Sequence, residues 1–398
     1  MIVREYIVCD TCEHPHMARI QVGHGGRQEH SFLCFNCKEP IRLAMDVDNE
    51  NVTTSVHLIS NCTRGGSPNA TPIYLSPDFV ADENKIHDQF YFGSFDFFNS
   101  IMASGQFEKA VSRLGDSKPK NISDSWAKLK KIWRLENARQ YSISAPLKKN
   151  FAEEFNAEAA HLRGNLWEFL NSTFRIDQEL VEELREIAFK NKSEFLRLLN
   201  FYQINLRPNN RRSQFDIISD YFNNYEAYSQ VFPYVRTAMP LPPSARATSI
   251  NFDDIKSFYA KAYEFYAGAI CIYTCLNNIK EGRPFDELKS ISLKDYLATD
   301  KAKRRISFSS NQTFSDASSE FDSKLRNASY HNWFFLRSDN KTIEFRSGGT
   351  GALETISYTE YLYRCVVLLS QVWKLTSFEL ILDELACEMA LVTKFPSM

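Results

Sequence analysis

The sequence lacks a long uninterrupted run of apolar residues. Its longest apolar runs, residues 266–276 and 366–369, are far shorter than the roughly 20 residues that a membrane-spanning helix needs. The first residues, Met1–Tyr6, do not have the apolar core of a secretory signal peptide. We therefore expect a cytoplasmic protein, and disulfide bonds are not expected in that compartment.

The chain also lacks an excess of charge of either sign, and no internal repeat is visible. It carries 47 basic and 49 acidic residues over 398 positions, which argues against a protein that coats nucleic acid with its whole surface. Phenylalanine, by contrast, is abundant, with 31 copies, which is typical of a folded chain with aromatic cores. The length is sufficient for two or three domains.

Four of the nine cysteines form two Cys-x-x-Cys pairs near the N-terminus. Cys9 and Cys12 make the first pair, Cys34 and Cys37 the second, and 21 residues separate the pairs. Each pair follows a run of residues that favour a β-strand. This spacing is typical of a two-knuckle zinc ribbon, in which four thiolates bind Zn²⁺ in a closed tetrahedral site. We predict a structural zinc that folds a segment too small to have its own core.

Other interpretations of these cysteines stay open. A redox Cys-x-x-Cys pair requires a thioredoxin-like βαβ setting, which the sequence does not provide. Four nearby histidines are either replacement ligands or surface residues: His14, His16, His24 and His30. Four cysteine ligands leave no open coordination position, so the metal is not expected to be catalytic. The ribbon can also present a surface to RNA, DNA or protein, and the sequence does not choose among them.

Beyond the ribbon, assigned to residues 1–60, the sequence predicts a connecting segment and a helical middle domain. Residues 61–98 contain Gly and Pro and then a phenylalanine-rich run that needs burial, which indicates a docked linker. Residues 99–246 read as successive helices, and Pro240, Pro242 and Pro243 end them at a predicted domain boundary. We recognise no family in residues 76–246.

One predicted helix of this region, residues 125–140, is rich in basic side chains. The range 113–149 contains ten Lys or Arg and three Asp or Glu. Trp126 and Trp133 are seven positions apart and so share a helical face, which we expect in the core. The side chains turned toward solvent are Lys128, Lys131 and Arg134. This face is either a binding surface for RNA phosphates or an ordinary solvated helix surface.

The remaining residues, 247–398, predict four helices and one hairpin. The first helix covers residues 251–279, and the second begins at Phe285 or Leu293. The third includes the apolar face from Ala317 to Ala328. The last begins at Tyr358 behind the Ser357-x-x-Glu360 capping box. Two short strands, residues 333–336 and 342–345, separate the last two helices. The chain as a whole is thus predicted to be mainly α.

The third helix carries the side chains best suited to chemistry, Arg326, Asn327 and His331. A histidine, with a pKa near ~6.5, can take or give a proton at neutral pH, and a guanidinium can pair with a phosphate. On an ideal helix Arg326 and His331 lie roughly 140° apart, so they share a site only if the helix stops or a second copy contributes. The alternatives are an ion pair of Arg326 with Asp322 and a hydrogen bond of His331 at the helix end.

The pattern Arg326-Asn327-x3-His331, placed between a long helix and a strand pair, resembles the Arg-x4-6-His motif of the HEPN superfamily, whose members are mostly metal-independent RNases. The resemblance implies a four-helix bundle that forms a homodimer with both Arg-His pairs in one cleft. It also implies that RNA is cut to products that end in a cyclic phosphate. In these roles His331 moves the proton, Arg326 binds the scissile phosphate and Asn327 orients it.

The same resemblance sets the functional alternatives. Trp333 stands where the HEPN subgroup that is modified by a partner nucleotidyltransferase has Tyr, which favours the nuclease. Such fusions look like bacterial anti-phage or abortive-infection effectors. The rival is a non-catalytic HEPN dimer that binds nucleic acid or protein. A basic run ahead of the motif supplies further candidate phosphate contacts, or is merely solvated: Lys303, Arg304 and Arg305.

Overall fold

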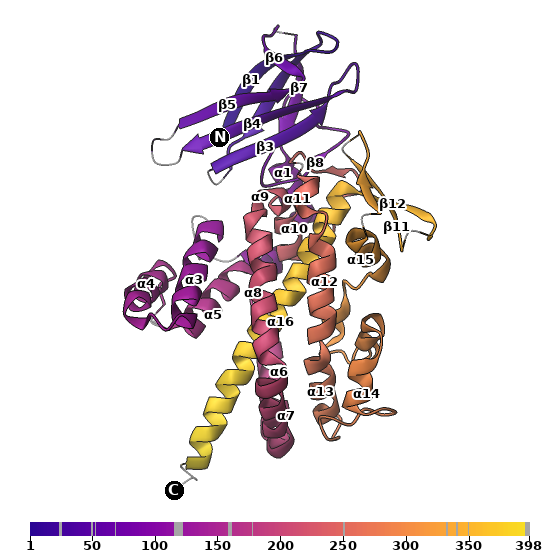
Figure 1. Cartoon of the computed structure of the whole chain (residues 1–398). Coiled ribbons are helices and arrows are strands. Elements are labelled where there is room, and N and C mark those ends of the chain that lie inside the picture. Colours follow the sequence, from indigo (N-terminus) through magenta and orange to yellow (C-terminus); the bar gives the residue numbers. More distant parts are fainter. Residues whose placement is uncertain are drawn as a thin grey trace. The chain divides into compact units, whose positions relative to one another are not determined.

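The computed structural model describes most of the chain, and 54% of the described residues are helical, which confirms the prediction of a mainly α protein (Figure 1). The described residues are 1–23, 26–48, 51, 53–67, 69–114, 122–157, 161–176, 178–249, 251–331, 333–339, 341–348 and 350–394. They belong to two compact units. Unit 1 comprises Met1–Asp124, Phe222–Ser257 and Asn327–Val366, and unit 2 comprises Ser125–Tyr221, Phe258–Arg326 and Val367–Met398.

Two β-sheets form the N-terminal part of unit 1. The first has the strand order β6-β1-β2-β7, formed by Ile2–Cys9 (β1), Pro15–Gln21 (β2), Cys62–Arg64 (β6) and Thr71–Leu75 (β7). The second has the order β3-β4-β5, formed by Gly26–Leu33 (β3), Pro40–Asp48 (β4) and Thr53–Ser60 (β5). All neighbours are antiparallel except β2 and β7, which are parallel. The β-branched and aromatic residues in these runs favour strands.

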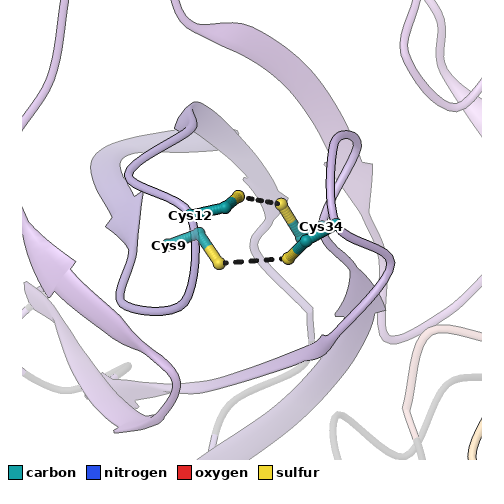
Figure 2. Close-up of side chains that lie close together, drawn as sticks. Cys9, Cys12 and Cys34 are labelled. Atoms are coloured by element: carbon teal, nitrogen blue, oxygen red, sulfur yellow. Dashed lines mark hydrogen bonds between the residues drawn. The ribbon is translucent and has the colours of Figure 1, made fainter.

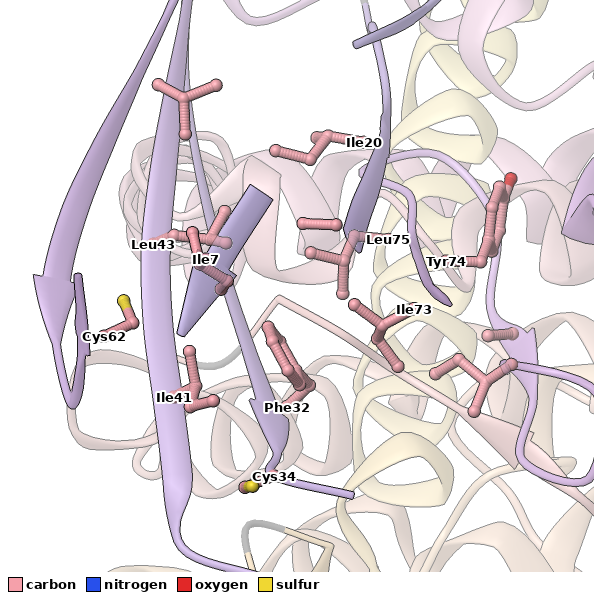
Figure 3. Packing of buried hydrophobic residues seen from close by; sticks show 14 of the residues in the cluster. Ile7, Ile20, Phe32, Cys34, Ile41, Leu43, Cys62, Ile73, Tyr74 and Leu75 are labelled. Carbon is pink, nitrogen blue, oxygen red and sulfur yellow. The ribbon is translucent and has the colours of Figure 1, made fainter. Parts of the chain in front are cut away.

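The two sheets share a hydrophobic core (Figure 3). The first sheet contributes Ile7 and Ile20, and the second contributes Phe32, Ile41 and Leu43, all at most 1% exposed. Strand β7 of the predicted linker adds Ile73 and Leu75 to the same core. The cysteine segment thus shares a hydrophobic core with residues after position 60, which complete it.

The rest of the predicted linker is only partly buried. Tyr91 and Phe97 are 7% and 1% exposed, but Phe90 and Phe95 are 82% and 64% exposed. The expectation that this phenylalanine run is buried thus holds for some rings and fails for others. The linker leads into the helices α1 (Gly93–Ala103) and α2 (Phe107–Leu114) of the same unit.

The chain around the predicted boundary at residue 246 lies inside unit 1. It follows the short helices α9 (Tyr225–Tyr228) and α10 (Phe232–Thr237), and strand β9 (Ala245–Arg246) pairs with β8 (Ala81–Asp82). The Thr248 backbone N–H donates to Gln230 Oε1 at 2.8 Å, and the Thr248 carbonyl accepts from the Ser31 N–H at 2.7 Å. The prolines follow the end of a helix, as predicted, but the chain after them hydrogen-bonds to strand β3 of the second sheet.

Three further strands and parts of two helices complete unit 1. Its third sheet has the order β10-β11-β12, formed by Phe334–Leu336 (β10), Thr342–Arg346 (β11) and Leu353–Ser357 (β12). The hairpin is confirmed, with Phe334 opposite Phe345, whereas the sequence did not predict β12. Helix α16 (Tyr358–Lys394) begins where predicted, since the Glu360 N–H donates to Ser357 Oγ at 3.0 Å.

The third predicted helix is shorter than expected. Residues Ser315–Ser318 form a 3₁₀ turn (η2), and helix α15 begins only at Ser323 and ends at Tyr330. Asp322 caps α15, because its Oδ1 accepts the N–H groups of Lys324 and Leu325 at 2.8 and 3.0 Å. The first predicted helix is likewise divided, into α11 (Phe252–Ile255), α12 (Phe258–Ala269) and α13 (Cys271–Lys280).

Unit 2 is helical and has an aromatic core. Its other elements are α3 (Ile122–Asn137), α4 (Tyr141–Glu154), α5 (Leu162–Thr173), α6 (Gln178–Lys190), α7 (Lys192–Asn205), α8 (Arg207–Asn223), α14 (Leu293–Ala298) and the 3₁₀ turn η1 (Lys301–Ser307). Phe169 lies between Trp126 and Trp373, with ring centroids 5.6 and 5.5 Å away. Trp126 is 2% exposed, which confirms its predicted place in the core.

Helix α16 is the one element, among those the structure describes, that is long and apolar enough over Tyr358–Met389 to cross a membrane. In the folded structure, 83% of the most apolar 18-residue stretch of this helix is buried. A core helix of a folded domain meets the same criteria of length and composition.

One buried carboxyl of α16 links the stability of unit 2 to pH. Glu379 is 5% exposed and accepts a hydrogen bond from the Tyr202 hydroxyl. Burial raises the pKa of Glu379 from 4.5 to about 7. The folded state therefore keeps a proton that the unfolded state releases, and the resulting stabilisation is lost as pH rises from about 4.5 to about 7.

We predict that Glu379→Gln removes this pH dependence. The free energy of unfolding of the unchanged protein should fall between pH 5 and pH 8 by up to about 3 kcal/mol more than that of the variant, as measured by urea denaturation. Equal pH profiles of the two proteins would show that Glu379 does not titrate in this window.

The shared core of the two sheets gives a second stability prediction. Leu43→Ala should lower the free energy of unfolding by about 2–5 kcal/mol, because Leu43 is fully buried on the central strand β4. Leu353→Ala is the matched control, since Leu353 is 50% exposed and should change stability by less than about 0.5 kcal/mol. Similar losses in the two variants would contradict this description of the core.

Candidate functional site

The four cysteines of the predicted ribbon lie together. Their Sγ atoms are all within 4.8 Å of one another, with Cys9 and Cys37 3.7 Å apart and Cys12 and Cys34 3.5 Å apart. In a tetrahedral site with Zn–S bonds of about 2.3 Å, neighbouring sulfur atoms are roughly 3.8 Å apart. Figure 2 shows the Cys9, Cys12 and Cys34 side chains turned toward a common centre. The cluster is therefore compatible with a bound metal ion.

The two pairs are held by two turns of the same geometry. Cys9 ends β1 of the first sheet, and Cys34 follows β3 of the second. In each turn the N–H of the residue after the second cysteine donates to the carbonyl of the first cysteine: Glu13 to Cys9 at 2.8 Å, and Lys38 to Cys34 at 3.1 Å. Glu13 and Lys38 both adopt the left-handed conformation, with φ of 60° and 65°. A metal held by both turns would join the two sheets.

Asn61 supports the cluster and was not identified from the sequence. Its Oδ1 accepts from Thr11 Oγ1 at 2.7 Å and lies 3.8 Å from Cys9 Sγ. Its Nδ2 donates to the Pro40 carbonyl at 3.0 Å. One side chain thus contacts both cysteine turns. A single asparagine 24 positions after Cys37 and 49 after Cys12 carries no local sequence signal for this role.

The electrostatic environment differs between the cysteines. A backbone hydrogen bond from His14 lowers the pKa of Cys12 to about 6. Burial raises the pKa of Cys34 to about 12. A cation at the centre of the cluster would offset the cost of burying the Cys34 thiolate, which fits this donor set to a divalent metal.

Of the histidines that were considered as ligands, His16 is the one described next to a cysteine sulfur. It is fully buried, and its Nε2 lies 3.4 Å from Cys34 Sγ. Burial lowers the pKa of His16 to about 4, so it is neutral at pH 7. His14 Nε2 pairs with Thr71 Oγ1 at 2.8 Å, and His30 Nδ1 lies 3.4 Å from Thr248 Oγ1. His24 lies outside the described residues.

Arg326 is held by acidic and aromatic neighbours within unit 2. Its Nε lies 2.8 Å from Glu264 Oε1, and its guanidinium lies 5.5 Å from the ring centroid of Tyr263. Glu264 also pairs through Oε2 with Lys301 Nζ at 2.7 Å. The sequence named Asp322 as an alternative ion-pair partner of Arg326, and the Oδ1 of Asp322 caps α15. Glu264 had no sequence signal that connected it with Arg326.

Asn327 and His331 belong to unit 1, because the division between the units falls after Arg326. His331 follows the last residue of α15, as predicted, and its side chain is exposed. Its backbone N–H donates to the Asn327 carbonyl at 3.1 Å, and its ring lies edge-on to Tyr330 at 5.1 Å. Asn327 Nδ2 donates to Ser347 Oγ at 3.4 Å. His331 is thus open to solvent at the corner between helix and hairpin.

The two groups of Lys and Arg residues that were predicted as phosphate contacts differ in solvent exposure. Lys128, Lys131 and Arg134 are exposed on α3, and Lys128 pairs with Glu154 at 2.5 Å. Part of the basic range 113–149, residues 115–121, lies outside the described residues.

In the second group, Lys303 is exposed but Arg304 is only 9% exposed. The Arg304 guanidinium donates to the Leu297 carbonyl at 2.5 Å and to the Ala267 carbonyl at 3.5 Å. Arg305 is half-buried and lies 5.6 Å from the Phe321 ring centroid. Arg304 therefore satisfies backbone carbonyls, and its predicted contact with phosphate does not fit this position.

No protein-family model matches this chain, and no curated protein or solved structure is significantly similar to it. The candidate sites therefore rest on the chain's own residues and their geometry.

The left-handed residue of the first cysteine turn provides a test of the site geometry. Glu13→Gly should leave stability unchanged or raise it by up to about 1 kcal/mol, whereas Glu13→Val should lower it by about 1–2 kcal/mol, because a β-branched side chain is strained at positive φ. The measurement is urea denaturation of the metal-loaded protein.

Glu39→Gly is the matched control, since Glu39 is an exposed residue of the second turn and does not have a positive φ. There glycine should destabilise by about 0.5–1 kcal/mol. The turn geometry would be contradicted if valine at position 13 were tolerated as well as glycine.

Proposed function

We propose that this chain is a metal-independent endoribonuclease whose reaction is carried by Arg326, Asn327 and His331. The observation that carries the proposal is the exposed side chain of His331, which directly follows α15. Arg326 lies on α15 itself, where Glu264 and Tyr263 of α12 contact its guanidinium. It is the only histidine after position 161. The order of helix, short motif helix, hairpin and long helix is the one that the HEPN resemblance implies.

In the proposed reaction the 2'-hydroxyl of RNA attacks the adjacent phosphorus. A new bond forms between the 2'-oxygen and phosphorus, and the bond from phosphorus to the 5'-oxygen breaks. His331 accepts the 2'-hydroxyl proton or donates a proton to the leaving 5'-oxygen. Arg326 pairs with the negative charge that builds on the phosphate, and Asn327 donates a hydrogen bond that orients it. The products carry a 2',3'-cyclic phosphate and a 5'-hydroxyl.

A single histidine cannot be both base and acid in one concerted step. The HEPN resemblance implies a homodimer in which two Arg-His pairs line one cleft, and this arrangement supplies one histidine for each role. We propose that the active species is such a dimer in the cytoplasm, acting on cellular or phage RNA as an anti-phage or abortive-infection effector.

We further propose that the cysteine cluster binds one Zn²⁺ with a structural role. All four protein ligands are thiolates that lie on turns of two sheets, so the ion has no position left for substrate. Zinc is the first-row ion best suited to a tetrahedral site of four sulfur atoms, apart from iron in iron–sulfur proteins.

A binding module is the competing function. The ion pair between Arg326 and Glu264 favours it, because the carboxylate competes with a phosphate for the same guanidinium. In that case the HEPN-like dimer binds nucleic acid or protein without cleaving it.

The two functions are separated by a cleavage assay on total RNA with excess EDTA in the reaction. We predict cleavage that EDTA does not reduce, and a loss of at least about a hundredfold in His331→Ala, since a general acid or base contributes roughly 10²–10⁴ to the rate. Arg326→Ala should lower the rate to a similar extent.

His57→Ala is the matched control for loss of a surface histidine. His57 lies on β5 and pairs with Asp46 at 2.8 Å, remote in sequence from the motif, and its removal should leave cleavage unchanged. RNA that stays intact with the unchanged protein, or cleavage that survives in His331→Ala, would rule out the nuclease and leave the binding module.

Metal analysis tests the zinc site independently of RNA cleavage. The purified chain should contain about one zinc per protomer by mass spectrometry, and Cys12→Ser should reduce both the zinc content and the midpoint of thermal unfolding. Cys387→Ser is the control, because Cys387 is exposed and outside the cluster. An equal zinc content in the two variants would contradict the assigned ligands.

A further inference from the structure

A cavity of about 190 Å³ lies in unit 2, between helices α3, α5, α8 and α16. It is smaller than the ~300–1,000 Å³ typical of sites for drug-sized ligands, which suits a single small ring system. Its lining is mostly apolar and aromatic, with a few polar side chains. This combination is typical of small-molecule sites. None of the residues that line it belongs to the cysteine cluster or to the Arg326-His331 motif.

Flat aromatic rings form one wall of the cavity. The rings of Trp133 and Phe215 are stacked, with centroids 4.7 Å apart and planes inclined by 18°. Trp126 lies beside Phe215 at 4.8 Å. Trp133 is half-buried, in contrast to Trp126. A planar ligand can therefore stack on this wall without displacing the core ring of Trp126.

A buried amide lines the same cavity. Gln214 is 4% exposed, and its Nε2 has no hydrogen-bond partner of normal geometry in the structure. The carboxyl of Glu379 lies next to it, and its raised pKa of about 7 leaves much of it protonated near neutral pH. Gln214 interacts with this carboxyl and lowers its pKa, but the amide makes no hydrogen bond of normal geometry through Nε2. An amide nitrogen can donate two hydrogen bonds, so a ligand edge with acceptors would stabilise it.

A half-buried cation lies at the cavity as well. Arg163 lines this cavity and a second, more open one beside it that includes His161 and Gly164. Within the part of the chain that the structure describes, Arg163 forms no ion pair. The other arginine of the lining, Arg211, already lies 3.4 Å from Asp383. Arg163 is thus placed to receive an anionic group that extends out of the cavity.

We propose that this cavity binds a nucleobase with an attached phosphate. The base stacks on the wall of Trp133 and Phe215, Gln214 pairs with the base edge, and Arg163 pairs with the phosphate. The shared chemistry is that of a free nucleoside monophosphate or of the terminal nucleotide of an RNA. The inference is independent of the proposed cleavage, because it uses different residues.

Calorimetric titration of the full-length protein tests the proposal. AMP, GMP, CMP and UMP are titrated separately, with adenosine and ribose 5-phosphate as partial ligands and a trinucleotide with a 5'-phosphate as the RNA end. We expect at least one monophosphate to bind with 1:1 stoichiometry and a Kd below about 1 mM. Each partial ligand should bind at least about tenfold more weakly. Tighter binding of the trinucleotide would identify an RNA end as the natural ligand.

Two variants assign the binding to this cavity. Arg163→Gln should weaken phosphate-dependent binding about ten- to hundredfold, and Trp133→Leu should weaken binding of the base. Arg212→Gln is the matched control, because Arg212 is exposed on α8, two positions before Gln214, and does not line the cavity, so this substitution should not alter the Kd. Circular dichroism confirms that each variant is folded.

The proposal is overturned if no monophosphate and no trinucleotide binds, or if binding survives unchanged in both folded variants. Adenosine that binds as tightly as AMP would overturn the role of Arg163, and ribose 5-phosphate that binds as tightly as AMP would overturn the role of the aromatic wall. This experiment measures nucleotide binding and not RNA cleavage. A negative result would therefore leave the nuclease proposal unchanged.

Discussion

The convergence of four thiol groups between two β-sheets is the constraint on which the N-terminal part of unit 1 depends. Cys9 and Cys12 come from the first sheet and Cys34 and Cys37 from the second, so one ion would join the sheets at one end. The hydrophobic core that includes Phe32 and Leu43 lies between the same sheets. Because this core is substantial, a metal bound there would add to the stability of the two sheets instead of replacing their core.

At the other candidate site, the chemistry depends on how a short helix presents two side chains. Asp322 caps α15, and Leu325 and Ala328 are buried on one of its faces. Arg326 is held by Glu264, whereas His331 is exposed just past the helix end. Under the proposed function, Arg326 would have to exchange the Glu264 carboxylate for a phosphate.

Features of the structure that depend on neighbouring residues could be predicted from the sequence. Features that depend on contacts between residues far apart in the sequence could not. Short sequence motifs predicted three features correctly: the clustering of the four cysteines, the Ser357 cap of α16, and the hairpin of β10 and β11. The parallel pairing of β7 with β2 joins residues more than 50 positions apart, and no local pattern indicates it. The contacts of Thr248 and of Asn61 and the burial of Arg304 are of the same kind. Prolines near position 242 marked the end of a helix correctly, but a helix end is not by itself a domain boundary.

The central claim is that an imidazole and a guanidinium cleave RNA by using its own 2'-hydroxyl. Mass spectrometry of the ends of a defined oligoribonucleotide, after incubation with the protein in EDTA, tests this claim most directly. We expect a 2',3'-cyclic phosphate on one fragment and a 5'-hydroxyl on the other, and an uncut oligonucleotide when the 2'-hydroxyl at the cleavage position is replaced by hydrogen. Fragments with a 5'-phosphate, or cleavage of the deoxy-substituted strand, would contradict the account.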